Sequence, residues 1–243
     1  MTPSPAALVT GGAAGIGAAI VRALVVAGHA VTFCDRDRTA GDRLSAETGA
    51  TFVCLDVLDE SARVRLFAEH GPFLILVNNV GADQHAFFSD TDANEWRRLI
   101  AINLETTFAF THGVLGAMQA AGYGRIINVS SEAGRLGSKG GAIYAAAKAG
   151  VIGFTRSIAR ENARYSVTCN AVLPGPVRTP MVDAALAVHG DRLERNMASL
   201  TLLNRLGRPE EIADVIAFLA SAKASFITGE AIGVSGGMGC GAG

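Results

Sequence analysis

Short apolar, β-branched runs alternate along the chain with longer stretches in which apolar residues recur at helical spacing. Strands that alternate with helices in this way form βα units, which build a parallel sheet. The predicted strands are AALVT, AVTFC, TFVCL, FLILVNN, RIINVS, SVTCNAVL and AIGVS, and the predicted helices cover residues 15–28, 39–48, 59–70, 92–121, 142–164 and 209–220.

These elements predict one α/β domain over residues 1–243, a Rossmann-type, doubly wound, parallel seven-stranded sheet flanked by helices. Near-continuous apolar strands such as FLILV suit a sheet that is covered on both faces. Right-handed crossovers place helices on each face. No linker, repeat or low-complexity segment divides the chain, and we interpret the glycine-heavy SGGMGCGAG as a terminal segment.

Composition and charge narrow the classes of protein that fit this chain. Hydrophobic residues make up 49% and charged residues 18%, as in folded globular proteins. The formal net charge is -1 and no basic run stands out, so we expect no nucleic-acid partner. There is no CxxC pair and no HExxH motif, so we expect no bound metal.

No uncharged apolar run approaches the roughly 18 residues of a membrane span, and no targeting segment is recognisable, so we expect a cytoplasmic protein with no membrane partner.

A glycine-rich turn, TGGAAGIG, joins the first predicted strand to the first predicted helix. Glycine permits positive φ and lets the backbone approach phosphate oxygens. The helix N-terminus adds free N–H groups and a partial positive charge. An ordinary glycine-rich turn has the same composition, so the motif alone is weak. The turn predicts a pyrophosphate site at Thr10, Gly11, Gly15, Ile16 and Gly17.

An acidic residue at the end of the second strand strengthens this interpretation. Asp35 follows Gly17 by 18 residues, near the spacing of about 20 at which a carboxylate binds the adenosine ribose. A carboxylate there repels a 2′-phosphate, so the sequence favours NAD as the cofactor. Arg36 follows directly and can receive a 2′-phosphate, so NADP stays open.

Further candidates follow the third and fourth strands. Ligands of open α/β sheets bind at the carboxyl edge, so these residues are expected to line the adenosine side of the site. Each polar residue alone could instead cap its own turn. The candidates are Asp56, Val57, Asn79, Val80 and Gly81.

The stretch IYAAAKAG places Tyr144 four positions before Lys148 in a predicted helix. Residues at this spacing share a helix face, so the phenol and the ammonium project into the same space. An ammonium stabilises a phenolate, and lowering a phenol pKa by about 3 units takes about 4 kcal/mol. The hypothesis is that Lys148, helped by a positively charged nicotinamide ring, acidifies Tyr144. The same spacing also occurs by chance in helices with a core tyrosine and a solvated lysine.

Ser131 supplies a third candidate group. It follows the strand RIINVS, 13 residues before Tyr144, at the carboxyl edge of the predicted sheet. Its hydroxyl can hydrogen-bond a substrate carbonyl oxygen. Ser130 is adjacent, but neighbouring side chains of a strand point in opposite directions, and the spacing favours Ser131.

In combination these motifs resemble the classical short-chain dehydrogenase/reductase family, and the resemblance covers essentially the whole chain. TGGAAGIG is similar to its TGxxxGxG turn, NNVG to its NNAG strand end and YAAAK to its YxxxK, with Val80 in place of the usual alanine. The resemblance implies that Asn103, in AINLET, holds a proton-relay water. It also places Pro174, Gly175, Val177 and Thr179, in PGPVRTPM, beside the nicotinamide, where Tyr144 and Lys148 also meet the cofactor.

The resemblance implies reversible hydride transfer between NAD(H) and a small secondary alcohol or ketone, with Tyr144 as general acid/base, and a homotetramer. EWRRLIAIN, SSEAGRLGS and SFITGEAIGVSGG are similar to members that oxidise hydroxyacyl-CoA compounds or cyclic alcohols. Two alternatives stay open. One is an NADPH-dependent 3-oxoacyl thioester (acyl-carrier-protein) reductase, and the other is a catalytically idle relative that serves as a binding subunit.

Substrate walls are expected from three loops, at residues 83–88, 132–141 and 177–200. Arg135 or Lys139 is the candidate for contact with the phosphates of a thioester, while Trp96 is expected to be a packing residue. A solvated loop is the plain alternative for most of these positions. The apolar candidates are Phe87, Phe88, Leu136 and Met181, and the other polar ones are Gln84, His85 and Glu132.

Overall fold

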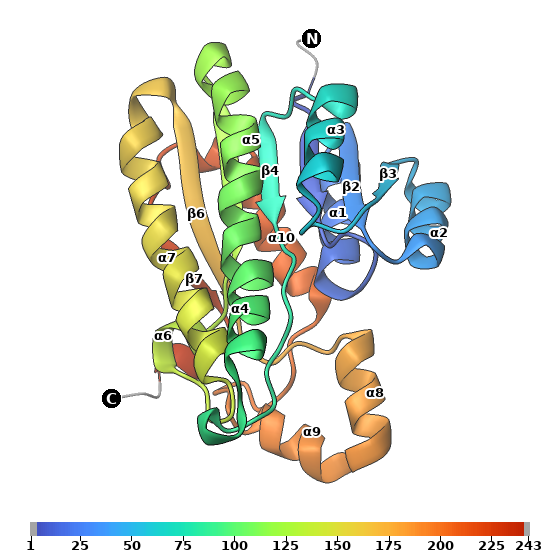
Figure 1. Cartoon of the computed structure of the whole chain (residues 1–243), viewed down its shortest axis with the longest axis vertical. Helices are drawn as coiled ribbons and strands as arrows, with labels where there is room; N and C mark the ends of the chain where they lie inside the picture. The colour runs from blue at the N-terminus through green and yellow to red at the C-terminus, as the bar shows by residue number, and fades with distance from the viewer. Residues whose placement is uncertain (1–3, 241–243) are drawn as a thin grey trace.

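The computed structural model describes residues 4–240 and contains one seven-stranded parallel sheet (Figure 1). The strand order is β3-β2-β1-β4-β5-β6-β7, so the chain reverses its direction of winding between β1 and β4. In an open α/β sheet this switch point is where ligands bind. The strands are β1 (Ala7–Thr10), β2 (Val31–Asp35), β3 (Thr51–Cys54), β4 (Ile75–Asn78), β5 (Gly124–Val129), β6 (Val167–Pro174) and β7 (Ala231–Val234).

Helices cover both faces of the sheet, as the doubly wound prediction required. Residues of α1 and α10 pack in one apolar core against β1, β2 and β4, and residues of α3, α5 and α7 pack in a second core on the opposite face. Figure 1 shows α3, α5 and α7 in front of the sheet and α1 and α10 behind it. The helices are α1 (Gly15–Val26), α2 (Arg38–Thr48), α3 (Glu60–His70), α4 (Ala93–Ile100), α5 (Thr106–Ala121), α6 (Ala133–Leu136), α7 (Ala142–Asn162), α8 (Pro180–His189), α9 (Asp191–Ala198) and α10 (Pro209–Ala220).

The register of the central strands brings their carboxyl ends to one edge. Thr10 of β1 pairs with Cys34 of β2, and Asn78 of β4 pairs with Asn128 of β5. The segments that carry the predicted site residues leave the sheet directly after these pairs. Their side chains therefore meet at this edge although they are far apart in sequence.

The predicted helix over residues 92–121 is wrong in one respect, because the structure divides it. A π-helical turn, η2 (Ala101–Glu105), separates α4 from α5 and contains Asn103. A π turn inserts one extra residue into the helical repeat and is frequent at functional sites. Hydrophobic periodicity does not register so short a change.

The expectation of a loop over residues 177–200 is also wrong, since α8 and α9 occupy most of this segment. Within the second expected loop, at residues 132–141, the chain forms α6. A local signal marks the start of α8. The Thr179 side chain accepts a hydrogen bond from the Val182 N–H, and Pro180 follows at the first helical position. Threonine at the N-cap and proline at N1 are typical of a helix start.

None of the helices among residues 4–240 is long and apolar enough to cross a membrane. Within the same residues, no group of three or more His, Cys, Asp or Glu side chains is arranged to hold a metal ion.

Candidate active site

The glycine-rich turn after β1 is held by the end of β4. The Thr10 hydroxyl accepts hydrogen bonds from the backbone N–H groups of Asn79 (3.0 Å) and Val80 (3.3 Å). The Asn79 amide donates in return to the carbonyl oxygen of Gly11, at 2.8 Å. Thr10 and Asn79 therefore set the shape of the turn.

The structure requires glycine at several positions of this turn. Gly11 and Gly15 have φ values of 65° and 53°, in the left-handed region that favours glycine. A Cβ on Gly17 would overlap the carbonyl oxygen of Gly11. Gly15 faces Thr179, whose side-chain methyl would lie 3.4 Å from a Cβ at that position. The turn and the segment after β6 therefore pack against each other at Gly15 and Thr179.

Asp35 stands at the carboxyl end of β2, beside the turn. One oxygen of its carboxylate accepts from the Ala13 N–H and the other from the Asp37 N–H, each at 3.1 Å. These bonds hold the carboxylate at the mouth of the cleft. Arg36 lines the same cleft, so the structure brings both candidate determinants of cofactor choice to one place.

A cleft of about 570 Å³ lies along the carboxyl edge, between the ends of β1 to β4. It is long and lined on one side by the glycine turn, as a dinucleotide site requires. It brings together the predicted residues Gly11, Asp35, Arg36, Asp56, Val57, Asn79, Val80 and Gly81, with Asp83, His85, Arg98, Ile102 and Met181 at its other end.

The four residues predicted to lie beside the nicotinamide, in the segment at the end of β6, have different surroundings in the structure. Thr179 packs against Gly15 of the glycine turn, whereas Val177 is buried in the core and pairs with Gly207. Gly175 packs against Ser235, where a Cβ would lie 2.9 Å from the serine Cβ. Pro174 is the last residue of β6. Val177 and Gly175 therefore support this segment by packing, and Ile16 does the same at the start of α1.

Tyr144 and Lys148 lie on the first two turns of α7, against the end of β5. The Lys148 ammonium donates a 2.9 Å hydrogen bond to the Val129 carbonyl, and the Lys148 carbonyl accepts from the Ser130 hydroxyl at 2.8 Å. Both bonds join α7 to the last residues of the strand. The Ser130 hydroxyl is thereby used in the interior, whereas the Ser131 hydroxyl lies beside the Tyr144 phenol and accepts from the Ala133 N–H at 3.1 Å.

Asn103 completes the group from the π-helical turn. Its side chain is buried, accepts from the Ala82 N–H at 3.1 Å and donates to the Ala82 carbonyl at 2.9 Å. Gly81 lies between Asn103 and Lys148, because a Cβ on it would be 3.0 Å from the Asn103 Oδ1 and 3.3 Å from the Lys148 Nζ. The absence of a side chain at Gly81 therefore keeps the space between these two groups open.

The electrostatics of Tyr144 differ from the sequence-based hypothesis. Burial raises the pKa of the Tyr144 phenol, a hydrogen bond with Ser131 lowers it, and the negative charge of Asp83 raises it again, with a net increase. Burial also lowers the pKa of Lys148 to about 8, partly offset by Asp83. The ammonium lies 5.8 Å from the centre of the Tyr144 ring. Acidification of Tyr144 by Lys148 is therefore not a property of the polypeptide by itself.

Of the expected apolar side chains, Met181 lines the cleft, and Phe87 and Phe88 follow its lining residues Asp83 and His85 in the same loop. Phe87, Phe88 and Met181 are each more than half exposed, and the Lys139 ammonium lies 5.8 Å from the centre of the Phe87 ring. Trp96 stacks on Phe88 and donates a hydrogen bond to the Thr91 hydroxyl. Trp96 is thus a packing residue, as predicted, and it supports one of the substrate candidates.

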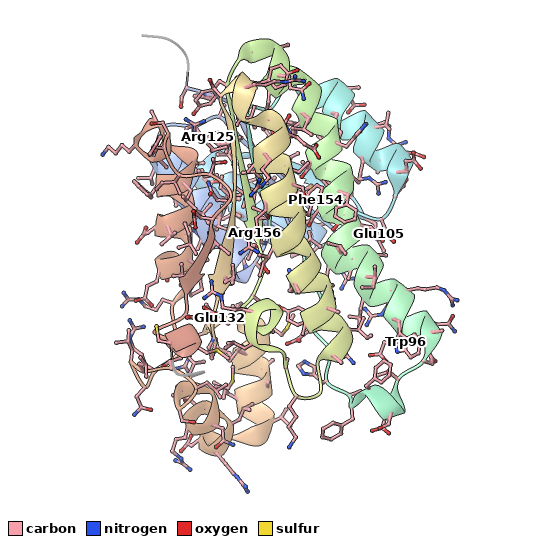
Figure 2. All side chains as sticks on the ribbon, turned by 90° about the vertical axis from the view of Figure 1, so that its left-hand side faces the viewer. Trp96, Glu105, Arg125, Glu132, Phe154 and Arg156 are labelled. Atoms are coloured by element: carbon pink, nitrogen blue, oxygen red, sulfur yellow. The ribbon has the colours of Figure 1, made fainter. Side chains whose placement is uncertain are left out.

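Glu132 and Arg135 were expected to face a polar substrate, and this expectation is wrong. The Glu132 side chain is 1% exposed and its oxygens lie 3.3 and 3.4 Å from one guanidinium nitrogen of Arg135. Arg135 also donates to the Ala231 carbonyl of β7. Figure 2 shows Glu132 at the lower end of the sheet, beside α6. The pair fastens α6 to the last strand instead of reaching a ligand.

Gln84 was also expected to face the substrate, and it does not. Its side chain is 4% exposed and accepts hydrogen bonds from the first turn of α7. Asp83, one residue earlier, lines the cleft. Its negative charge adds to the increase in the pKa of Tyr144 and offsets part of the decrease in the pKa of Lys148. Asp83 is the first residue of the substrate loop expected over residues 83–88, but the sequence analysis did not predict its effect on the pKa of Tyr144.

Taken together, the sheet, the cleft and the Tyr, Lys, Ser and Asn side chains define a dinucleotide-dependent oxidoreductase. A family model described as Enoyl-(Acyl carrier protein) reductase matches residues 11–239. The acetoacetyl-CoA reductase of Shinella zoogloeoides is 41% identical, over 97% of this chain and 98% of that protein. The (3R)-3-hydroxyacyl-CoA dehydrogenase of Rattus norvegicus is 37% identical, over 97% of this chain and 96% of that protein.

Among solved structures, the 3-oxoacyl-[acyl-carrier protein] reductase from Brucella melitensis has a TM-score of 0.88 and 35% identity, over 96% of this chain and 91% of that chain. These similarities extend over nearly the whole of each protein. The chain therefore belongs to the classical short-chain dehydrogenase/reductase family of nicotinamide-dependent oxidoreductases, which confirms the resemblance drawn from its motifs.

Proposed function

We propose that this protein catalyses reversible hydride transfer between NAD(H) and the 3-hydroxy or 3-oxo group of an acyl thioester such as an acyl-CoA. The observation that carries the proposal is the convergence of Ser131, Tyr144, Lys148 and Asn103 beside one dinucleotide-sized cleft. The thioester substrate is supported by relatives whose names specify acetoacetyl-CoA and 3-hydroxyacyl-CoA.

The residues of the cleft fit a nicotinamide dinucleotide. Gly11, Gly15 and Gly17 let the turn pack closely, and no side chain caps the N-terminus of α1, whose N–H groups suit a pyrophosphate. Asp35 is positioned to accept hydrogen bonds from a ribose. Asp56, Val57, Asn79, Val80 and Gly81 line the remaining wall. When bound, the nicotinamide supplies or accepts the hydride, while the polypeptide places the reacting carbon and handles the proton.

The proton chemistry falls to Tyr144. Because burial raises the pKa of its phenol, Tyr144 is protonated at neutral pH and suited to donate a proton to a carbonyl oxygen. Ser131 orients that oxygen, Lys148 holds the ribose, and Asn103 holds a relay water for proton exchange with solvent. The polypeptide by itself thus favours ketone reduction at neutral pH, and alcohol oxidation accelerates as the pH rises.

NAD is the preferred cofactor in this proposal because the Asp35 carboxylate is fixed at the cleft mouth by two backbone N–H groups. A 2′-phosphate would meet that negative charge at close range. One observation favours a second candidate, an NADPH-dependent 3-oxoacyl thioester (acyl-carrier-protein) reductase. Arg36 lines the cleft beside Asp35, and the Brucella melitensis structure carries the corresponding name.

A spectrophotometric assay tests the proposal. Absorbance of the reduced nicotinamide is followed with NAD(H) and NADP(H) and with acetoacetyl-CoA, 3-hydroxybutyryl-CoA, the free 3-hydroxy acid and cyclohexanol. Turnover of the CoA thioesters with NAD(H), at least ten times faster than that of the free acid, supports the proposal. Faster turnover with NADPH and an acyl-carrier-protein thioester supports the second candidate. No turnover with any pair supports an idle binding subunit and contradicts both.

We further propose that the chain is one domain that works as a homotetramer assembled through α5 and α7. The rings of Phe108 and Phe154 lie 4.6 Å apart across these helices, and Phe108 is 39% exposed. Figure 2 looks onto this face, with Phe154 between the two helices. Light scattering on the purified protein would give the mass of four chains, and a monomeric mass would contradict the assembly.

A further inference from the structure

Gln84 is a buried polar residue in an otherwise accessible loop. Its neighbours Asp83 and His85 have exposed side chains, whereas Gln84 is 4% exposed. A buried amide needs hydrogen-bond partners, since leaving it unpaired costs about 1–3 kcal/mol. Its partners therefore indicate what the residue does.

Those partners are at the start of α7. The Gln84 Oε1 accepts from the backbone N–H groups of Ile143 (2.9 Å) and Tyr144 (3.2 Å). The N-cap residue of α7 is Gly141, which has no side chain with which to cap the helix. The first N–H groups of a helix lack partners within it and are normally satisfied by a Ser, Thr, Asp or Asn side chain at the N-cap. Gln84 performs this task from a loop that is distant in sequence.

The same loop is fastened at two further points. The Gln84 Nε2 donates to the Ala86 carbonyl at 3.3 Å, and the Ala86 N–H donates to the Gly140 carbonyl at 3.1 Å. At its other end, both backbone groups of Ala82 bond to the Asn103 side chain. Residues 82–86 thus connect the π-helical turn to the first turn of α7. Figure 1 shows this segment, after β4, running to the end of the molecule where α7 begins.

The first turn of α7 has few other hydrogen bonds: the Ala145 N–H donates to the Gly141 carbonyl at 2.8 Å. Ala145 is buried, whereas Ala142 is exposed and Ile143 and Tyr144 are half-buried. An uncapped helix end frays because its first residues gain few intrahelical bonds for the entropy they lose. The two bonds to Gln84 therefore supply the side-chain cap of the turn that carries Tyr144.

We propose that Gln84 is a positioning residue for catalysis, which caps α7 from the loop after β4 and so fixes Tyr144 relative to Ser131 and Asn103. The inference deepens the proposed function, on which it rests for the role of Tyr144. It assigns Gln84 no contact with the substrate or the cofactor. The cap also couples Asn103 and Tyr144 through the shared segment 82–86.

The test compares two glutamines that bond opposite ends of α7. Gln84→Met removes the capping oxygen and keeps the length of the side chain. Gln119→Met is the matched control, because the Gln119 amide donates at 2.8 Å to Asn162, the last residue of α7. Both variants lose a side-chain bond to the same helix, but only Gln84 bonds its catalytic turn.

The first measurement is amide hydrogen exchange on the protein without added ligand. In Gln84→Met, the peptide covering residues 142–148 is expected to exchange at least tenfold faster than in the wild type. In Gln119→Met, that peptide is expected to exchange at the wild-type rate. Equal protection of this peptide in the wild type and in Gln84→Met would overturn the capping assignment, whatever the enzyme activity.

The second measurement is steady-state kinetics with acetoacetyl-CoA and NADH. Gln84→Met is expected to lower kcat at least tenfold, with the KM for NADH within threefold of the wild type, because a shift of about 1 Å in a catalytic group can cost 100-fold. Gln119→Met is expected to stay within twofold. Gln84→Glu keeps an oxygen acceptor for the two N–H groups and is expected to restore the wild-type exchange rate of residues 142–148.

Several results would overturn the inference. They are wild-type kcat in Gln84→Met, an equal loss of kcat in Gln119→Met, or exchange of residues 142–148 in Gln84→Glu as fast as in Gln84→Met. If Gln84→Met does not fold, the exchange of Gln84→Glu decides, since its first turn must then be protected as in the wild type. A wild-type protein that is inactive on every substrate refutes the proposed function, while the exchange experiment still tests the cap.

Discussion

The Lys148 ammonium donates to the Val129 carbonyl at 2.9 Å while it lies 5.8 Å from the centre of the Tyr144 ring. The strand end therefore holds the lysine, and the helix that carries both residues sets its distance from the phenol. Lys148 is buried, and because burial destabilises the charged form, its pKa is lowered to about 8. This arrangement leads to predictions for Tyr144, Lys148 and the groups around them.

Replacing Tyr144 with Phe removes the proton donor and leaves the ring in place. We expect kcat to fall at least 1,000-fold, within the range that general acid catalysis contributes. The Kd for NADH, measured by fluorescence, is expected to stay within threefold. Tyr165→Phe is the control, since Tyr165 packs in the core away from the site. Turnover of Tyr144→Phe near the Tyr165→Phe level would refute the role of Tyr144.

Lys148 is predicted to make stability depend on pH. Its pKa is about 8 in the folded protein and 10.5 in the unfolded chain, so between these values the unfolded state binds more protons. Folding stability from this group therefore rises with pH across that window, by up to about 3 kcal/mol. Urea unfolding of the wild type and Lys148→Met at pH 7.5, 8.5 and 9.5 isolates the effect. The free energy of unfolding of the wild type minus that of the variant must increase with pH, and a constant difference contradicts the assignment.

Asp83→Asn is predicted to shift the pH profile of alcohol oxidation to lower pH. The Asp83 charge raises the pKa of Tyr144, so its removal lets the phenol ionise at lower pH. The pH at half-maximal kcat/KM for oxidation reports this change. Asp90→Asn, in the exposed turn before α4, is the control and is expected to keep the wild-type profile. A profile that is unmoved or moved to higher pH would show that Asp83 does not act on Tyr144.

Asp35→Asn is predicted to relax cofactor choice. Loss of the carboxylate removes the repulsion of a 2′-phosphate, so the ratio of kcat/KM for NADPH to that for NADH is expected to rise at least tenfold. Asp37→Asn retains an oxygen that can cap α2 and serves as the control. An unchanged ratio in Asp35→Asn would assign cofactor choice to another residue, with Arg36 as the first candidate.

Arg135→Met is predicted to lower the free energy of unfolding by about 3 kcal/mol, because it leaves the buried Glu132 carboxylate without its counter-charge. This is the low end for a buried pair, since 37% of the Arg135 side chain is exposed. The double variant Glu132→Gln/Arg135→Met is expected to recover most of the loss in a urea titration. Arg178→Met breaks only exposed ion pairs and is expected to change stability little. An equal decrease in the free energy of unfolding in Arg135→Met and in the double variant would contradict a buried, coupled pair.

Much of the fold and most of the site follow from local patterns. The glycine turn, the acid after the second strand and the Tyr–Lys spacing each lie within one βα unit or one helix, where sequence distance and spatial distance are linked. Parallel strands then bring the ends of these units to one edge, so the predicted residues meet there. The π-helical turn at Asn103 was missed because one inserted residue hardly changes the period of a helix.

The amino-acid sequence by itself thus determined the α/β class, the family and the candidate residues that meet at the carboxyl edge, because periodicity and spacing encode them locally. Only the tertiary structure decided which loop side chains are buried and bond other parts of the protein instead of facing a ligand. Gln84 caps α7 and Glu132 pairs with Arg135, although both stand in stretches that look solvated. It also decided that the pKa of Tyr144 is raised and not lowered, since burial depends on every element packed around a group and not on its neighbours in sequence.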